Sequence, residues 1–271
     1  MTFSFLALDR TLGVLGVATA SRSLAVGAGV PGLDPAAGVV VSQAWTNRVL
    51  RALVLERLRA GVGAPAAVDL AVARDGGARF RQVGAVGLDG SVGVFTGAET
   101  TPWAGHRTGE GWLAVGNLLA GPDVLDAMVE AFHRPRPPVR VATDAAVPAP
   151  GVAVHPDGMT VGAPDADDPA AAALGRRLLD ALRAGERVGG DRRGRQSAAL
   201  LVARVQPVSI APPQLVLDLR VDDGEDPLGA LARLLALRER DLAQPSNGVT
   251  APRTTVTPSD SFAHQWGVEQ P

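Results

Sequence analysis

Residues 2–8 read Thr-Phe-Ser-Phe-Leu-Ala-Leu, a short and mostly apolar run that is typical of a β-strand. The run ends at residues 9–13, Asp-Arg-Thr-Leu-Gly, whose final glycine indicates a turn. Residues 14–20 then predict a second strand. If the two strands pair as a hairpin, Thr2 lies at the end far from the turn. This pairing places Thr2 close to three residues at the end of the second strand: Ala20, Ser21 and Arg22.

Thr2 is itself a candidate catalytic residue. It follows Met1, and a methionine before a small residue such as threonine is normally removed after synthesis. We therefore expect Thr2 to carry a free α-amine, whose reference pKa near ~8 allows it to accept the hydroxyl proton. One residue would then supply both a nucleophile and its general base. Many proteins begin with the same dipeptide and make no use of the threonine. Whether Thr2 is catalytic therefore depends on evidence from the rest of the chain.

Composition bounds the class of protein. The chain has 271 residues, of which 46% are hydrophobic and 20% are charged, so it can bury a sizeable core. A net charge of −2 without a basic cluster argues against nucleic acid as a partner. The absence of cysteine excludes disulfides and thiolate metal sites, and the absence of lysine excludes a catalytic lysine amine. No apolar segment is long enough for a membrane span and no secretory signal is visible, so we expect a cytoplasmic protein.

The remaining sequence alternates between strand-like and helix-like patterns. Apolar residues at helical spacing, with Thr46 or Asn47 as the cap, predict a helix over residues 47–60. Further helices are predicted at residues 65–74, 122–133, 170–184 and from Asp226-Pro227 onward. Further strands are predicted at residues 39–42, 81–88, 91–96, 112–116, 198–205 and 215–221. This order favours an α+β layered domain over a doubly wound parallel sheet.

We expect one domain over residues 1–243. Residues 134–170 are rich in proline and predict an irregular insertion, with a short ribbon at residues 152–154 and 159–161. Proline, serine, threonine and asparagine dominate residues 244–271, which predict a flexible tail.

Two glycine-punctuated stretches contain candidate site residues. Residues 103–112 include His106, which can act as an acid or a base near neutral pH. Residues 116–121 include Asn117 at a predicted strand-to-helix junction, where backbone N–H groups and the Asn117 amide could meet an oxyanion. For residues 103–112, a glycine-rich surface loop is an equally good interpretation. For Asn117, an equally good interpretation is that its side chain satisfies backbone groups at the junction.

A third polar stretch, residues 189–197, precedes a predicted strand. Its Asp191 could bind charged groups of a substrate, although such a loop is more often simply solvated. The acids Asp222-Asp223 and Glu225-Asp226 could bind a hard cation, but they precede a helix, where acids are favoured without metal. We therefore expect neither a metal nor a cofactor.

Together these stretches resemble a bacterial and archaeal family catalogued as domain of unknown function 1028, which is grouped with the N-terminal nucleophile (Ntn) hydrolases. The resemblance covers about residues 1–133 and 170–240. The matching blocks, in family order, are residues 1–4, 16–22, 25–27, Gln43-Ala44, 96–97, 103–111, 116–121, 189–200 and 218–223.

The resemblance implies a four-layer αββα sandwich, two packed sheets with helices outside, and Thr2 as the nucleophile. It also implies substrate-binding candidates at Ser21, Arg22, Ser42, Gln43, His106, Asn117 and Asp191. Ser21 and Ser42, at neighbouring strand ends, are the next candidates for a nucleophile. Proteasome-like members of the superfamily place a lysine beside the nucleophile, whereas this chain offers Arg22, which can lower the pKa of the amine but cannot act as a base.

The chain departs from the family pattern in two places. One is the insertion at residues 134–170. The other is the Arg-Val-Leu-Arg string at residues 48–51, which replaces a string rich in proline, tyrosine and glycine after Gln43-Ala44. A changed loop there could reshape or close a substrate pocket.

Three hypotheses follow. The first is a cytoplasmic amidohydrolase that cleaves an amide bond of an unknown small substrate through Thr2. The second is a non-catalytic ligand-binding protein on the same fold, favoured by the missing lysine and the altered segment after Ala44. The third is a subunit of a homo-oligomer.

Overall fold

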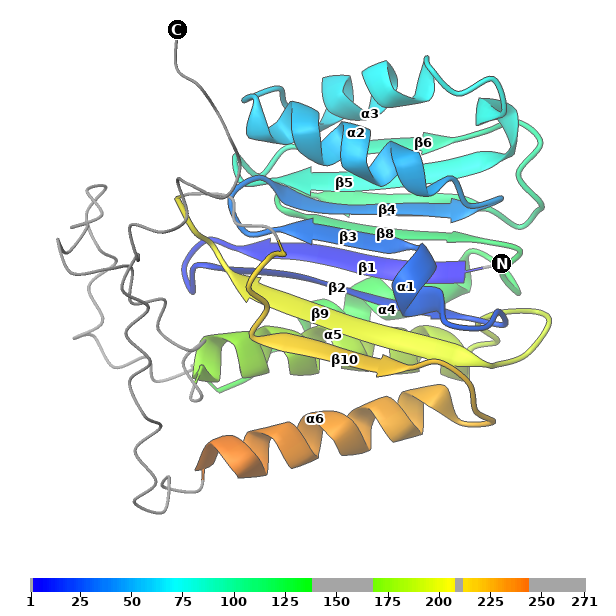
Figure 1. Ribbon diagram of the computed structural model, residues 1–271. Coiled ribbons are helices and arrows are strands. Elements are labelled where there is room, and N and C mark those ends of the chain that lie inside the picture. The colour runs from blue at the N-terminus through cyan, green and yellow to red at the C-terminus, as the bar shows by residue number, and fades with distance from the viewer. Residues whose placement is uncertain (1, 138–167, 208–211, 244–271) are drawn as a thin grey trace, which may run out of the picture.

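The computed structural model describes residues 2–137, 168–207 and 212–243. These residues form a mixed α+β structure with two antiparallel sheets and six α-helices (Figure 1). Within them, no helix is both long and apolar enough to cross a membrane. The predicted ribbon at residues 152–154 and 159–161 and the predicted tail from residue 244 lie outside the described residues.

The larger sheet, called sheet A here, has six strands in the order β10-β9-β2-β1-β8-β7. The strands are β1 (Thr2–Asp9), β2 (Val14–Ser21), β7 (Gly105–Gly109), β8 (Trp112–Asn117), β9 (Ser197–Arg204) and β10 (Leu217–Val221). The first two strands pair as the predicted hairpin, with Thr2 opposite Ser21, so that prediction is confirmed.

The smaller sheet, called sheet B, has four strands in the order β3-β4-β5-β6. The strands are β3 (Pro31–Asp34), β4 (Gly38–Ala44), β5 (Arg81–Gly87) and β6 (Val92–Thr96). The turn at Asp89-Gly90 joins β5 to β6 as predicted, and Gly90 adopts a positive φ of 80°, which glycine tolerates without strain.

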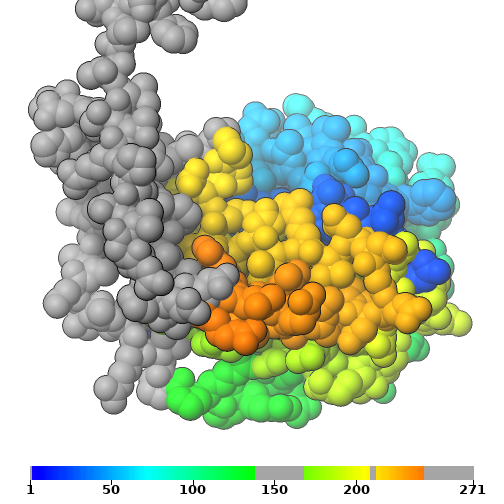
Figure 2. All heavy atoms as spheres, turned by 60° about the horizontal axis from the view of Figure 1, so that its bottom comes forward, coloured from blue at the N-terminus to red at the C-terminus, as the bar shows by residue number. Residues whose placement is uncertain are grey.

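Helices cover the outer faces of both sheets (Figure 1). The described helices are α1 (Val26–Gly29), α2 (Arg48–Arg59), α3 (Ala64–Val72), η1 (Ala78–Phe80), α4 (Asp123–His133), α5 (Pro169–Arg187) and α6 (Pro227–Ala243). Sheet B packs on α2 and α3, and sheet A packs on α4, α5 and α6. In the space-filling view α6 lies at the surface beside β9 and β10 (Figure 2).

Apolar side chains of β1 point to both faces of sheet A, and both faces are buried. Phe3 and Phe5 point to the α4 and α5 side, where Phe5 stacks on Phe132 with ring centroids 4.3 Å apart. Leu6 points to the other side and joins a core between the two sheets. The side chains of β1 therefore alternate between the helix face and the intersheet face of sheet A. Polar residues of β1 that share the face of Leu6 lie between the two sheets.

The sequence pattern missed two strands and one α-helix, and also the short 3₁₀ helix η1. Residues 103–112, interpreted as a glycine-rich loop, contain the edge strand β7, which pairs with β8. The short strand β3 and the one-turn helix α1 were also not predicted. In β7 the glycines and charged residues hide the strand pattern, because an edge strand with exposed side chains needs no apolar alternation.

Candidate functional site

Thr2 begins β1, between β2 and β8 of sheet A. Its strand partners are Ser21 on β2 and Asn117 on β8. The Thr2 hydroxyl donates a hydrogen bond to Ser21 Oγ at 3.2 Å. All three side chains are buried, with exposed fractions of 5% or less. Polar groups from three adjacent strands therefore meet at this end of the sheet.

A buried polar network joins this end of sheet A to sheet B. We define the intersheet network as Thr2, Ser4, Thr19, Gln43, Gln82 and Asn117. Ser4 Oγ lies 2.9 Å from Thr19 Oγ1 and 2.8 Å from Gln43 Oε1. Because one hydroxyl carries one hydrogen, Ser4 donates to the Gln43 oxygen and accepts from Thr19.

Gln43 and Asn117 hold the backbone of Thr2 from two directions. Gln43 Nε2, from sheet B, lies 3.4 Å from the Thr2 carbonyl oxygen, and Asn117 Nδ2, from sheet A, lies 3.5 Å from it. Both amides donate a second, shorter hydrogen bond to Gln82 Oε1, at 2.9 Å and 3.0 Å respectively. The first residue of β1 is therefore held in place by both sheets.

Two backbone conformations mark the ends of the strands that supply these amides. Ala44 follows Gln43 with a φ of 68°, and Leu118 follows Asn117 with a φ of 54°. Such left-handed conformations in non-glycine residues carry strain and occur often at functional sites. Each of these two left-handed residues directly follows a residue of the intersheet network.

Ser42 lies apart from this cluster. It precedes Gln43 on β4, so its side chain points to the opposite face of sheet B. There its hydroxyl donates to the carbonyl oxygen of Asn47, the residue that caps α2, at 2.9 Å. Its observed contact is therefore with the helix layer and not with Thr2.

Arg22 and His106 are both exposed at the edge of the site. The Arg22 guanidinium donates to Gln196 Oε1 at 2.9 Å, so this side chain contacts the loop after α5. His106 lies on the edge strand β7, where partial burial and the neighbouring Arg107 charge lower its pKa. Within the described residues, neither side chain is hydrogen-bonded to Thr2.

Asp191 organises the loop of residues 189–197. Its carboxylate accepts hydrogen bonds from the backbone N–H of Arg22 and of Arg193, both at 2.8 Å. The Arg193 guanidinium adds an ion pair at 3.3 Å. Asp191 therefore fastens this loop to the end of β2, next to Ser21.

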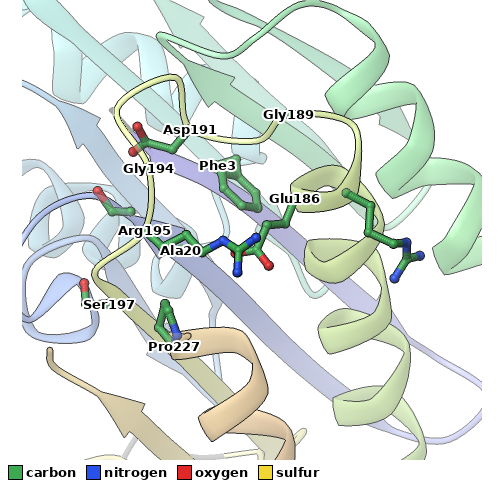
Figure 3. Close-up of a pocket in the computed structure, with 11 residues that line it drawn as sticks. Phe3, Ala20, Glu186, Gly189, Asp191, Gly194, Arg195, Ser197 and Pro227 are labelled. Atoms are coloured by element: carbon green, nitrogen blue, oxygen red, sulfur yellow. The ribbon is translucent and has the colours of Figure 1, made fainter. Parts of the chain in front are cut away.

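A pocket of about 260 Å³ lies beneath this loop. Figure 3 shows Glu186 from α5 and Arg195 from the loop meeting in the pocket, with Phe3 of β1 behind them. Ser21 also lines the pocket, so the pocket adjoins the residue that accepts the Thr2 hydrogen bond. Burial raises the pKa of Glu186, and the Arg195 charge opposes that effect.

The acidic stretch at residues 222–226 is used structurally. Gln196 Nε2 donates to Asp223 Oδ1 at 3.1 Å, and Asp226 Oδ1 accepts from the backbone N–H of Gly229 in the first turn of α6 at 3.0 Å. In the part of the chain that the structure describes, no three acidic or histidine side chains are grouped as a metal site.

A family model described as a family of unknown function, DUF1028, matches residues 2–231. The chain belongs to the DUF1028 family. The crystal structure of protein SPO2555 from Silicibacter pomeroyi, which carries the same family assignment, is similar to it at 31% identity and a TM-score of 0.65. That match covers 90% of this chain and 87% of the other. No curated protein matches the chain.

Four residues of the DUF1028 site were not among the sequence candidates: Ser4, Thr19, Gln82 and Glu186. Ser4 carried a usable signal, because Thr2 and Ser4 alternate with Phe3 and Phe5 on one strand. Gln82 and Glu186 carried none, since their roles depend on partners far away in the sequence.

Proposed function

We propose that this DUF1028 protein is an Ntn-type amidohydrolase with Thr2 as its N-terminal nucleophile. The supporting observation is the position of Thr2: its hydroxyl is bonded to Ser21 and its carbonyl is held by amides from both sheets. The order of helices, sheet, sheet, helices is what a four-layer αββα sandwich of the Ntn type requires. Loss of Met1 is the chemical step that would free the Thr2 amine.

In this mechanism the free amine of Thr2 takes the proton from its own hydroxyl. Oγ1 then forms a bond to the carbonyl carbon of the substrate amide. The C–N bond breaks, and the amine product leaves with the proton. Water hydrolyses the resulting ester, which restores the Thr2 hydroxyl and releases the acid.

The intersheet network has a positioning role in this proposal. Both hydrogens of the Asn117 amide are occupied, one toward the Thr2 carbonyl and one toward Gln82. We therefore assign Asn117 to holding the Thr2 backbone, and backbone N–H groups remain for the developing oxyanion. Gln43 holds the same carbonyl from the other sheet.

The first test is the N-terminus of the purified protein. We expect intact-mass measurement to find Met1 absent from most molecules. Periodate, which cleaves a 1,2-amino alcohol, should then convert Thr2 to a glyoxylyl group with a matching loss of mass. Met1 on nearly all molecules would contradict the mechanism.

The second test is turnover of a panel of chromogenic amides. Thr2→Ala should reduce the rate by several orders of magnitude because it removes the nucleophile, whereas Thr2→Ser should retain activity. Thr108→Ala removes a hydroxyl from an exposed position of sheet A and should leave the rate unchanged. Wild-type turnover by Thr2→Ala would move the search to Ser21 or Ser42. Tight binding without turnover by any variant would support a non-catalytic binding protein.

A further inference from the structure

The pocket beneath residues 189–197 is built from four separate parts of the chain. Its walls come from the end of α5, the loop that follows, the adjoining ends of β1 and β2, and Pro227 at the start of α6. Gly194 has a φ of 105°, and an added Cβ would meet no atom within 4 Å. The glycine-rich string noted in the sequence therefore forms one open wall of a cavity.

Most polar groups on the pocket wall are already bonded within the protein. Asp191 accepts two backbone hydrogen bonds and pairs with Arg193. Ser197 donates to the Ser23 carbonyl and accepts from the Val26 N–H. These groups shape the pocket, and their bonding capacity is already in use.

Glu186 is different. Its side chain is only 17% exposed, and its closest ionic contact is Arg195 Nε at 3.4 Å. Burial and nearby charges, and no hydrogen bond, are the causes that shift the pKa of Glu186, so the Arg195 contact acts as an ion pair. An ionised carboxylate can accept about four hydrogen bonds, so this one retains most of its capacity.

The surroundings of Glu186 favour a cation. It lies in the last turn of α5, where the helix dipole is negative and a carboxylate is unfavourable. The charges that act on it are those of Arg195, Arg183 and Arg187, which oppose the effect of burial, and that of Asp226, which adds to it. Of the three cations, Arg195 forms an ion pair with the Glu186 carboxylate.

Arg195 has a second carboxylate within reach. Its Nη1 lies 4.0 Å from Asp226 Oδ1, and its side chain is half exposed. Arg195 can therefore turn from Glu186 toward Asp226 and remain paired. A small movement of one side chain would open the Glu186 carboxylate to a ligand.

We propose that this pocket binds the ammonium group of a small molecule, with Glu186 as its acceptor and Arg195 as the side chain it displaces. A volume of about 260 Å³ suits a ligand of amino-acid size. Ser21 lines the pocket and also accepts the Thr2 hydrogen bond, so an ammonium bound to Glu186 would lie on the α5 face of sheet A, around the strand end from the Thr2 hydroxyl on the opposite face. This inference rests on the proposed function, and it implies that the substrate is an amide that also carries a primary ammonium group.

The binding test compares n-pentylamine with its uncharged isostere 1-pentanol in NMR titrations of the full chain. We expect the amides of Gly189 and Gly194 to shift with pentylamine, and its affinity to exceed that of pentanol by about fivefold. In Glu186→Gln the ratio should fall to about one. Equal affinities in the wild type, or an unchanged ratio in Glu186→Gln, would overturn the inference.

Arg195→Ala should have the opposite effect on amine affinity to Glu186→Gln. Removal of the competing guanidinium should increase pentylamine affinity, again by a few-fold, with little effect on pentanol. A loss of amine affinity would count against the pocket even if Glu186→Gln failed to fold. Glu56→Gln makes the same chemical change as Glu186→Gln at an exposed position of α2 and should leave both affinities unchanged.

A kinetic comparison separates this inference from the proposed function. It uses the p-nitroanilides of N-acetyl-lysine and N-acetyl-norleucine, which differ in the ammonium group. Faster cleavage of the lysine compound, lost in Glu186→Gln, would support both proposals. Thr2-dependent cleavage without that preference would refute the ligand class alone. Amine binding that needs Glu186 in a protein that hydrolyses no amide would refute the hydrolase alone.

Discussion

At the residue scale, Gln82 is the centre of the intersheet network. Its Nε2 lies within 3.3 Å of Thr96 Oγ1 and of the carbonyl oxygens of Gly105 and Gly116. Its Oε1 accepts from Gln43 and Asn117. One fully buried amide thus connects β4, β5 and β6 of sheet B to β7 and β8 of sheet A.

Replacement of Gln82 should therefore be costly. Gln82→Leu retains the volume but leaves the Gln43 and Asn117 donors without their shared acceptor. We expect it to lower the free energy of unfolding by about 3 kcal/mol, measured by urea denaturation. Gln206→Leu, a partly exposed position after β9, is the matched control and should change it by less than about 0.5 kcal/mol. Equal effects of the two variants would contradict a central role for Gln82.

Glu186 should link stability to pH. Its folded-state pKa lies above the reference value of 4.5, because burial disfavours the charged form. The protonated group therefore favours the folded state fully below about pH 4.5, and this contribution is lost as the pH rises through the folded pKa. Ionised Glu186 thus reduces stability at neutral pH.

Glu186→Gln should remove this dependence. Relative to the wild type, the variant should gain stability between pH 4.5 and pH 7, as measured by urea denaturation at both values. Glu56→Gln controls for the loss of one carboxylate. A relative loss of stability in Glu186→Gln over that interval would show that its ion pair outweighs the cost of burial.

At the element scale, the close approach of β5 and β8 positions the network. A Cβ on Gly84 of β5 would lie 2.4 Å from Leu113 Cδ2 of β8, so a larger residue would require Leu113 or the strands to move where the two sheets meet. Gly84 is two residues along β5 from Gln82 and therefore faces the same side of sheet B. The packing of the strands thus determines how closely Gln82 approaches β8.

Gly84→Ala should push the sheets apart. We expect a loss of about 1–3 kcal/mol in the free energy of unfolding from overpacking. It should also slow any Thr2-dependent reaction, because the amides that hold Thr2 come from both sheets. Gly76→Ala, where an added Cβ meets no atom within 4 Å, should alter stability by less than about 0.5 kcal/mol. A neutral Gly84→Ala would mean that the sheets adjust freely at this point.

At the scale of the whole molecule, the described elements form three hydrophobic core clusters and the candidate site. The family match ends at residue 231, and the last helix ends at Ala243. The composition of residues 244–271 offers no apolar stripe for packing. A chain that ends at Ala243 should therefore melt within a few degrees of the full chain in a calorimetric scan. Insolubility or a large fall in melting temperature would show that the last residues contribute to the fold.

Local patterns in the sequence were sufficient for most elements. Apolar runs bounded by turns predicted β1, β2 and the β5–β6 hairpin, and helical spacing with Thr46 or Asn47 as the cap predicted α2, which Asn47 caps. These features depend on neighbouring residues, whose propensities and turn chemistry are readable along the chain. The same local argument placed Thr2 near Ala20, Ser21 and Arg22, and the structure pairs it with Ser21.

The arrangement of the site required the tertiary structure. Gln43 and Gln82 carry no local signal, because their role arises when two sheets bring residues 35 to 41 positions apart into hydrogen-bond contact. The same holds for Glu186, whose environment is set by the loop and by the packing of α5 on β1. Sequence alone determined which strand begins with Thr2, whereas sheet-to-sheet packing decided what surrounds it, because hydrogen bonds and burial depend on distances in space.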